Sequence, residues 1–259
     1  MNALQIAATG MGAQEQNVNV ISNNIANINT TAYKRQRASF QDLLYLTEKA
    51  PGATTSNAGT MAPTGLQTGL GVRIGSTYKV MEQGPVQRTG APLDVAIQGR
   101  GFFKITMPDG TTGYTRDGAF QRSDNGDMVT SQGFQLDPAI NIPIDFKDLT
   151  ISGTGIISGK QGENTVELGQ VTVAMFVNEA GLENIGDNLY KETAASGAPA
   201  DSVPSEDGSG TLLQAHLEAS NVDAVQETTD LIKAQRAYEL NSRVIATADQ
   251  MLNAVNQIR

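Results

Sequence analysis

Residues 231–255 read "LIKAQRAYELNSRVIATADQMLNAV", in which apolar side chains recur every seven positions. A seven-residue repeat is typical of a helix that packs lengthwise against another helix. Residues 211–259 contain neither proline nor glycine, which favours one uninterrupted helix. Three apolar lines indicate a face broad enough for several neighbours. The lines are Leu231, Tyr238, Ile245 and Leu252; Ala234, Asn241, Ala248 and Val255; and Ala237, Val244, Met251 and Ile258.

The amino-terminal end carries the same repeat and has no proline before Pro51. A helix of about 30 residues would be about 45 Å long, and Gly10 and Gly12 each weaken it by up to ~1 kcal/mol relative to alanine. We expect this helix to pair antiparallel with the carboxy-terminal one. That pairing gives no contact to the third apolar line of the carboxy-terminal helix. The amino-terminal lines are Leu4, Met11, Val18 and Ile25; and Ala7, Gln14, Ile21 and Ile28.

The end of the first helix is rich in asparagine, since residues 21–37 read "ISNNIANINTTAYKRQR". Asparagine is a mediocre helix former because its amide competes for nearby backbone groups. Either the helix is about to end there, or something outside the chain occupies those amides. A basic cluster of Lys34, Arg35 and Arg37 follows. We interpret it either as a solvated helix exit or as a contact with acidic surface on a neighbouring copy.

The middle of the chain reads as β-structure. "LDVAIQGRGFFKI" (93–105) is apolar in short bursts, and Asn125-Gly126 is a strong hairpin signal because a type I′ turn needs positive φ. Two stretches rich in Gly, Pro, Ser and Thr read as linkers. We therefore predict an α+β fold, with long terminal helices forming a coiled-coil-like inner domain and an inserted irregular antiparallel β domain. The predicted parts are a helix over 1–35, an extended inter-subunit segment over 36–75, the β domain over 76–195, a return linker over 196–219 and a helix over 220–259 capped by Ser220 or Asn221.

Bulk composition narrows the function classes. The net charge of −9 and the pI near 4.6 argue against a nucleic-acid partner, whose binders carry a basic face. The absence of cysteine excludes disulfides and thiolate chemistry. No stretch approaches the ~20 apolar residues of a membrane span. The first basic residue is Lys34, so we expect a protein that is cytosolic or leaves by a route that reads no cleaved signal.

Motifs for catalysis or ligand binding are weak. His216 is the only histidine, and without cysteine it cannot anchor a zinc site, so a surface or subunit-contact role is expected. "GTGIISGK" (153–160) is one residue short of a phosphate-binding loop and reads as a hairpin turn. "SDNGD" (123–127) departs from the calcium-loop pattern. We predict no catalytic, cofactor-binding or metal site, although a catalytic carboxylate pair stays open among the 27 acidic residues.

Four stretches resemble the axial rod and hook proteins of the bacterial flagellum, over nearly the whole chain. They are "SNNIANINTTAYKRQRASF" (22–40), "LDVAIQGRGFF" (93–103), "YTRDGAF" (114–120) and "SNVDAVQETTDLIKAQRAYELNSRVIATADQML" (220–252). Within the family, residues 40–72 and "SGAPADSVP" (196–204) look most like distal rod subunits. The larger proximal rod protein, which differs in the 40–72 segment, is the alternative.

The resemblance implies a structural subunit without cofactors that polymerises helically into a rigid hollow shaft. Such a shaft crosses the periplasm, transmits torque to the hook and conducts exported subunits. The implied partners are further copies of the chain, proximal rod proteins, the hook protein, the P- and L-ring bushing proteins, the flagellar type III export apparatus and the rod cap, with no nucleic acid and no membrane insertion. A cell-wall hydrolase and a secreted cap or chaperone are the competing classes.

The resemblance also implies where copies meet. We expect residues 1–30 and 225–259 to be poorly ordered in the monomer and to form helices on assembly, and residues 40–72 to reach between subunits and stiffen the shaft. Met11, Val18 and Ile25 are expected to face the carboxy-terminal helix. The expected assembly interface comprises Leu4, Met11, Val18, Ile21, Asn24, Ile25, Asn27 and Ile28 in the first helix, and Leu231, Ala234, Tyr238, Ile245, Ala248, Leu252 and Val255 in the second, with Lys34, Arg35 and Arg37 as an inter-subunit basic cluster.

Overall fold

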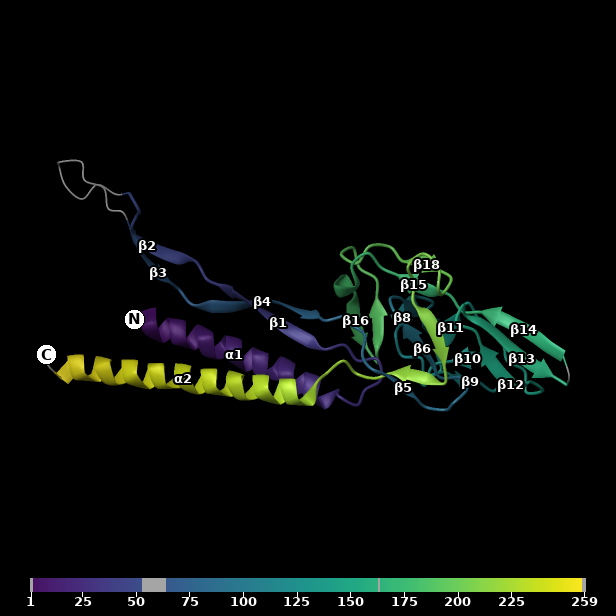
Figure 1. The fold of residues 1–259 in the computed structure, drawn as a ribbon. Coiled ribbons are helices and arrows are strands. Elements are labelled where there is room, and N and C mark those ends of the chain that lie inside the picture. The colour runs from purple at the N-terminus through teal and green to yellow at the C-terminus, as the bar shows by residue number, and fades with distance from the viewer. Residues whose placement is uncertain (1, 53–63, 163, 258–259) are drawn as a thin grey trace. The chain divides into compact units, whose positions relative to one another are not determined.

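The computed structural model describes residues 2–52, 64–162 and 164–257 (Figure 1). Helix α1 (Asn2–Ala26) opens the chain, helix α2 (Ala224–Gln257) closes it, and mostly antiparallel β-structure lies between them in sequence. The chain divides into two compact units. The helical unit comprises residues 1–26, 36–79 and 223–259, and the β unit comprises residues 27–35 and 80–222. The predicted α+β class is therefore confirmed at this level.

In the helical unit, α1 and α2 lie side by side and antiparallel (Figure 1). Gly10 of α1 lies opposite Asn241 of α2, and Asn24 lies opposite Glu227, so the paired residue numbers run in opposite directions. Helix α2 is capped by Asp223, because its Oδ1 atom accepts hydrogen bonds from the N–H groups of Val225 and Gln226 at 2.8 and 3.2 Å. The predicted caps Ser220 and Asn221 are therefore wrong by two or three residues.

The rest of the helical unit is a β ribbon. Strand β1 (Gln36–Asp42) pairs antiparallel with β4 (Val72–Lys79), and β2 (Tyr45–Lys49) pairs with β3 (Leu66–Gly69). Both β1 and β4 lie against α1. Gly71 has φ +115° and a Cβ there would come within 2.1 Å of Thr9 Oγ1, so only glycine allows this approach. Half of the predicted 36–75 segment is thus strand, and its residues 53–63 lie outside the described residues.

The β unit is built on one large antiparallel sheet with the order β16-β17-β8-β7-β11-β10-β9, in which β15 pairs with both β7 and β18. A three-stranded sheet has the order β12-β13-β14, and β19 and β20 pair with β6 and β5. The strand bounds are β5 Val86–Arg88, β6 Val95–Gln98, β7 Phe102–Thr106, β8 Thr112–Thr115, β9 Gln121–Arg122, β10 Met128–Val129, β11 Gln135–Asp137, β12 Lys147–Ile151, β13 Ile156–Gln161, β14 Asn164–Gln170, β15 Val173–Met175, β16 Glu183–Gly186, β17 Leu189–Lys191, β18 Ala200–Ser202, β19 Thr211–Gln214 and β20 His216–Glu218, with a 3₁₀ turn at Glu179–Gly181.

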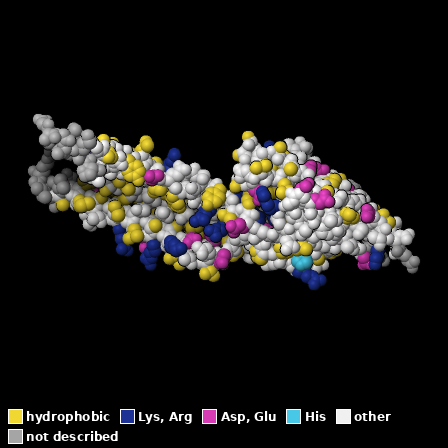
Figure 2. Space-filling model, turned by 45° about the horizontal axis from the view of Figure 1, so that its top comes forward, with side chains coloured by type: hydrophobic (Ala, Val, Ile, Leu, Met, Phe, Trp, Pro, Cys, Tyr) yellow, Lys and Arg dark blue, Asp and Glu magenta, His cyan; other side chains and the backbone are white. Residues whose placement is uncertain are grey.

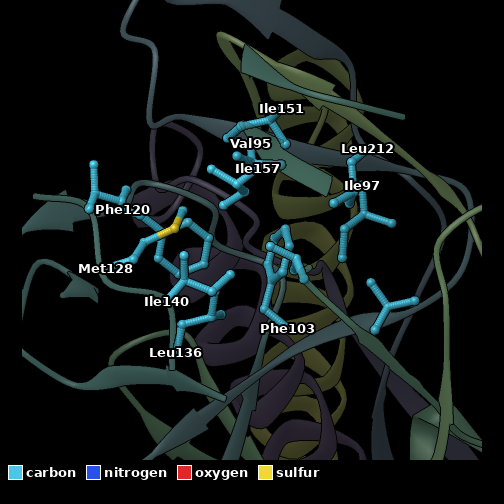
Figure 3. Close-up of a cluster of buried hydrophobic side chains, with 13 residues drawn as sticks. Val95, Ile97, Phe103, Phe120, Met128, Leu136, Ile140, Ile151, Ile157 and Leu212 are labelled. Atoms are coloured by element: carbon cyan, nitrogen blue, oxygen red, sulfur yellow. The ribbon is translucent and has the colours of Figure 1, made fainter. Parts of the chain in front are cut away.

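The core of the β unit consists of two apolar clusters. Figure 3 shows the larger one, in which side chains from β6, β7, β13 and β19 point toward one another. The smaller cluster places Phe102 edge-on against Phe176 and Tyr190, with ring centroids 5.8 and 5.7 Å apart. The stretch 93–105 therefore supplies strands β6 and β7, which both contribute side chains to the larger cluster. Gly99 and Gly101 between them both have positive φ, which glycine adopts readily, and the chain bends there.

Two predicted turns are confirmed. Gly126, at φ +89°, donates its N–H to Ser123 O at 2.8 Å in the turn between β9 and β10. Gly155, at φ +84°, donates to Ser152 O at 3.0 Å in the hairpin between β12 and β13, so "GTGIISGK" is a hairpin and not a phosphate-binding loop.

Residues 196–219 read as a return linker in the sequence, but they contain strands β18, β19 and β20. Strand β19 pairs with residues 95–98 of β6, and its Leu212 is buried in the larger cluster. Gly, Pro and Ser suit the tight turns between these short strands as well as they suit a linker. Composition alone does not reveal a pairing with a strand more than 100 positions away.

Candidate assembly surfaces

One face of α2 lies against α1. We call Glu227, Ala234, Asn241 and Ala248 the inner line of α2. Ala234 and Ala248 are buried, Glu227 bonds Asn24 of α1, and the Asn241 amide lies about 3 Å from the position of a Cβ on Gly10. Ala234 and Ala248 of this line, and Gly10 opposite it, are small enough for the two helices to pack closely.

Asn24 explains part of the asparagine-rich stretch. Its Nδ2 atom donates to Gln36 O at 2.9 Å and to Glu227 Oε2 at 3.1 Å, and its Oδ1 atom accepts from Gln36 N at 2.8 Å. The side chain is 1% exposed. A buried amide needs such partners, and here they come from the same chain. Asn24, predicted at the assembly interface, is therefore placed inside the chain, where it joins α1, β1 and α2.

The remaining predicted interface residues lie mostly along the inner faces of the two helices. On α1, Ile21 is buried and Leu4, Met11, Val18 and Ile25 are half-buried; Ile28 and Asn27, which follow α1, are also half-buried. On α2, Leu231 and Ile245 are half-buried beside the inner line. Only Tyr238 and Leu252 are exposed among them, at 44% and 38%. The side chain of Val255 and all of Ile258 lie outside the described residues.

A second apolar face of α2 is exposed. We call Val225, Ile232, Leu240, Val244 and Met251 the outer stripe of α2; their side chains are 47–74% exposed. At 100° per residue the outer stripe is rotated roughly 120° around the helix axis from the inner line. Val244 and Met251 belong to the third apolar line of the sequence. That line was the signal for this face, although it was not carried into the predicted interface.

The β ribbon of the helical unit is apolar on its surface as well. Leu44, Tyr45, Leu46 and Leu66 are 50–82% exposed. Figure 2 shows hydrophobic side chains gathered over this unit. Large exposed apolar patches on a soluble chain mark contact sites for another molecule, so the ribbon and the outer stripe are the candidate assembly surfaces.

The predicted basic cluster is split by the structure. Arg37 is exposed on β1 and Arg35 is half-buried, but Lys34 is 1% exposed. The Lys34 ammonium pairs with the Glu218 carboxylate and donates to Glu82 O at 2.8 Å. Lys34 therefore cannot meet acidic surface on a neighbouring copy in this conformation, and its predicted inter-subunit role is corrected.

Glu218 is the centre of a buried charge cluster in the β unit. Its carboxylate also accepts hydrogen bonds from Arg116 Nε and Gly84 N, both at 2.9 Å. Arg116 in turn donates to the carbonyl groups of Gly99 and Gly101 at 2.7 and 3.1 Å. Burial lowers the pKa of Lys34 below its usual range, and the nearby Arg116 lowers it further, while Glu218 raises it. Since all three side chains are at most 2% exposed and fully engaged, the cluster is structural rather than catalytic.

Two further features, metal-binding clusters and membrane-spanning helices, are absent from the described part of the chain. Over residues 2–52, 64–162 and 164–257 no group of three or more His, Asp or Glu side chains is placed to hold a metal ion. His216 lies in β20, half-buried, with Nδ1 2.6 Å from Gln214 O. None of the helices, within the residues described, is long and apolar enough to cross a membrane.

Three family models match the chain. They are described as "Flagella basal body rod protein" over residues 4–34, "Flagellar hook protein FlgE/F/G D1 domain" over residues 96–159, and "Flagellar basal body rod FlgEFG protein C-terminal" over residues 213–258. The first and last matches cover most of α1 and α2, and the middle match covers the centre of the β unit.

Several curated proteins named "Flagellar basal-body rod protein FlgG" are similar to this chain over its full length. The identity is 54% with the protein of Caulobacter vibrioides, covering 100% of both chains. It is 51% with that of Agrobacterium fabrum, covering 99% of both chains. It is 48% with that of Buchnera aphidicola subsp. Baizongia pistaciae, covering 98% of both chains.

Proposed function

Since the chain belongs to the flagellar basal-body rod protein family, we propose that it polymerises through its terminal helices into the distal part of the rod. It is a structural subunit of the flagellar rod and not an enzyme. The observation that carries the polymerisation proposal is the outer stripe of α2, an apolar face that the chain's own helical unit leaves exposed. In a helical polymer a patch on one copy meets a different patch on the next, so the contact does not close.

The proposed geometry places the helices innermost. In this proposal α1 and α2 pair as an antiparallel coiled coil through the inner line of α2, while the outer stripe contacts α-helices of adjacent copies. The seven-residue repeats in both helices and their antiparallel packing support it. Arg35 and Arg37 remain proposed contacts to acidic surface on a neighbour.

The proposed partners and location follow from the family. We place the polymer in the basal body, crossing the periplasm toward the outer membrane, after export without a cleaved signal by the flagellar type III apparatus. Its neighbours would be the proximal rod proteins, the hook protein, the P- and L-ring bushing proteins and the rod cap. Residues 40–72 would reach between subunits and stiffen the shaft. A proximal position is the alternative; none of the relatives described above favours a cell-wall hydrolase.

Substitution in the outer stripe tests the proposal. Val244→Asp places a carboxylate in the middle of the proposed contact, where an unpaired buried charge is strongly unfavourable, so polymerisation followed by sedimentation should be lost. Gln235→Asp is the matched control, because it adds the same charge to the same helix at an exposed position outside the stripe. Polymerisation of Val244→Asp at the level of the control, with both variants equally folded, would contradict the proposal.

A further inference from the structure

Residues 27–35 connect α1 to β1 in sequence, yet they belong to the β unit. We call them the entry segment. The segment contains no helix or strand and contributes no side chain to either apolar cluster of the β unit. Ala32 and Tyr33 are buried outside these clusters, and the segment is also attached to the rest of the unit through polar contacts. Local segments of this kind can open without unfolding the unit to which they belong.

The contacts of the entry segment reach the carboxy-terminal side of the β unit, residues 216–222. Ala32 N–H donates to Glu218 O at 2.8 Å, and Asn221 N–H donates to Tyr33 O at 3.3 Å. Arg35 N–H donates to the Asn221 side-chain oxygen at 2.7 Å. The Lys34–Glu218 and Arg35–Asn221 partners are 184 and 186 positions apart in sequence. These bonds hold the entry segment to the last residues of the chain that precede α2. The segment is also tied elsewhere in the β unit by Thr31, whose Oγ1 donates to Asp117 Oδ2 at 2.9 Å and whose carbonyl accepts from Asn188 Nδ2 at 3.1 Å.

A third stretch, residues 80–84, joins the same cluster. Val80 N–H donates to Arg35 O at 2.9 Å. The Asn221 side-chain amide donates to Val80 O at 2.9 Å and to Glu82 O at 3.0 Å. One asparagine side chain therefore bridges the points at which residues 27–35, 80–84 and 216–222 meet. These stretches contain the β-unit ends of all four crossings between the β unit and the helical unit along the chain.

The charge cluster around Glu218 makes the positions of the three stretches depend on one another. Glu218 lies in the carboxy-terminal stretch, Lys34 in the entry segment and Gly84 in the third stretch, and Arg116 extends the cluster from the loop after β8. Each charged group is fully buried and paired. Removing one partner of a buried ion pair leaves the other charge uncompensated, which is strongly destabilising. Neither the entry segment nor the carboxy-terminal stretch can leave the cluster without stranding a charge on the other, and departure of residues 80–84 removes one hydrogen bond from Lys34 and one from Glu218.

We propose that residues 27–35, 80–84 and 216–222 form a latch, closed by Lys34, Glu218, Arg116 and Asn221, that opens and closes as one step while the sheet of the β unit stays folded. The latch makes attachment of the amino-terminal entry segment conditional on the carboxy-terminal strand β20. This inference concerns the single chain, so it holds or fails independently of the proposed polymer.

Amide hydrogen exchange on the full-length chain tests the latch. Three amides report on it without touching the Lys34 side chain, those of Ala32, Val80 and Asn221. Lys34→Met should speed exchange at all three by at least about tenfold, while the amides of Phe103 and Ile105 in β7 keep their wild-type rates. Lys104→Met is the matched control, because Lys104 also pairs with two carboxylates of the β unit, Asp201 at 2.8 Å and Asp137 at 3.3 Å, but outside the latch. The control should leave the three amides unchanged.

Two results would overturn the latch. One is wild-type exchange at Ala32, Val80 and Asn221 in Lys34→Met. The other is an equal acceleration in β7, which would make the entry segment part of the global fold. If Lys34→Met fails to fold, amide hydrogen exchange of the wild-type chain at increasing denaturant concentrations provides the test. The three amides must then exchange through a shared opening that occurs at lower denaturant than the opening of β7, and exchange together with β7 would refute the proposal.

Discussion

Asn24 shows, at the scale of single residues, how an unfavourable helix residue is retained. Its buried amide group makes hydrogen bonds to the backbone N–H and carbonyl of Gln36 and to the Glu227 carboxylate. Replacement by alanine leaves three groups without that partner, so Asn24→Ala should lower the unfolding free energy by about 1–3 kcal/mol. Asn19→Ala, at an exposed position of α1, is the control and should change it by less than about 0.5 kcal/mol. Chemical unfolding followed by the helical signal measures both, and equal effects would contradict the role of Asn24.

The lowered pKa of Lys34 should make the unfolding free energy of the chain depend on pH. Burial first, and then Arg116, lowers its pKa below 10.5, so the folded chain binds this proton less tightly than the unfolded chain does. Stability should therefore rise with pH between the lowered pKa and 10.5, where only the unfolded state holds the proton. Because other groups titrate there too, the comparison is with Lys34→Met. The unfolding free energy of the wild type minus that of the variant should increase as pH approaches 10.5. A decrease of this difference would contradict the lowered pKa of Lys34.

The sequence predicts an accessible basic cluster at Lys34, whereas the structure buries this side chain, and the difference has a physical reason. Arg35 and Arg37 beside it suggest a solvated basic cluster, and local sequence holds no hint of a carboxylate 184 positions away. Asn24 was singled out correctly as unusual, but the source of its partners was assigned to a neighbouring copy. Residue types that need a partner can thus be recognised from sequence, whereas the identity of the partner depends on long-range pairing.

At the scale of elements, the two helices were predictable because their signals are local: a seven-residue repeat and the absence of proline and glycine from residues 211–259. The turns at Gly126 and Gly155 were predictable for the same reason. Strands β18, β19 and β20 were not, since they are short and pair with distant partners. The division of the α2 surface into an inner line and an outer stripe also needed the position of α1.

The packing of α1 on α2 can be tested with two glycines of the same helix. Gly12 faces open space, so Gly12→Ala should stabilise the helical unit by up to about 1 kcal/mol through helix propensity. A Cβ at Gly10 would lie 3.0 Å from Asn241 Nδ2, so Gly10→Ala should lose that gain. Adding Asn241→Ala to Gly10→Ala should restore it. Urea unfolding measures all three, and an equal gain for Gly10→Ala alone would show that the two helices do not meet there.

At the scale of the whole molecule, charge is unevenly distributed. The helical unit contains eight basic and eight acidic residues, and the β unit contains ten and nineteen, so the entire net charge of −9 lies in the β unit. Neutral helical units can associate without net repulsion, while β units carried on the same polymer repel one another. We therefore expect polymer yield to rise between about 20 and about 150 mM salt, as the screening length falls toward about 8 Å. Sedimentation at constant osmolarity checks this, and a fall in yield over that range would point to attractive charge contacts instead.

The central claim is that the terminal helices, through the outer stripe of α2, build a hollow helical shaft from copies of this chain. Electron cryomicroscopy of polymerised full-length protein tests it most directly. The account predicts a tube lined by α1 and α2, with Val244 and Met251 covered by helices of adjacent copies. A tube in which these side chains remain exposed, or a protein that stays monomeric at every concentration and salt, would contradict it.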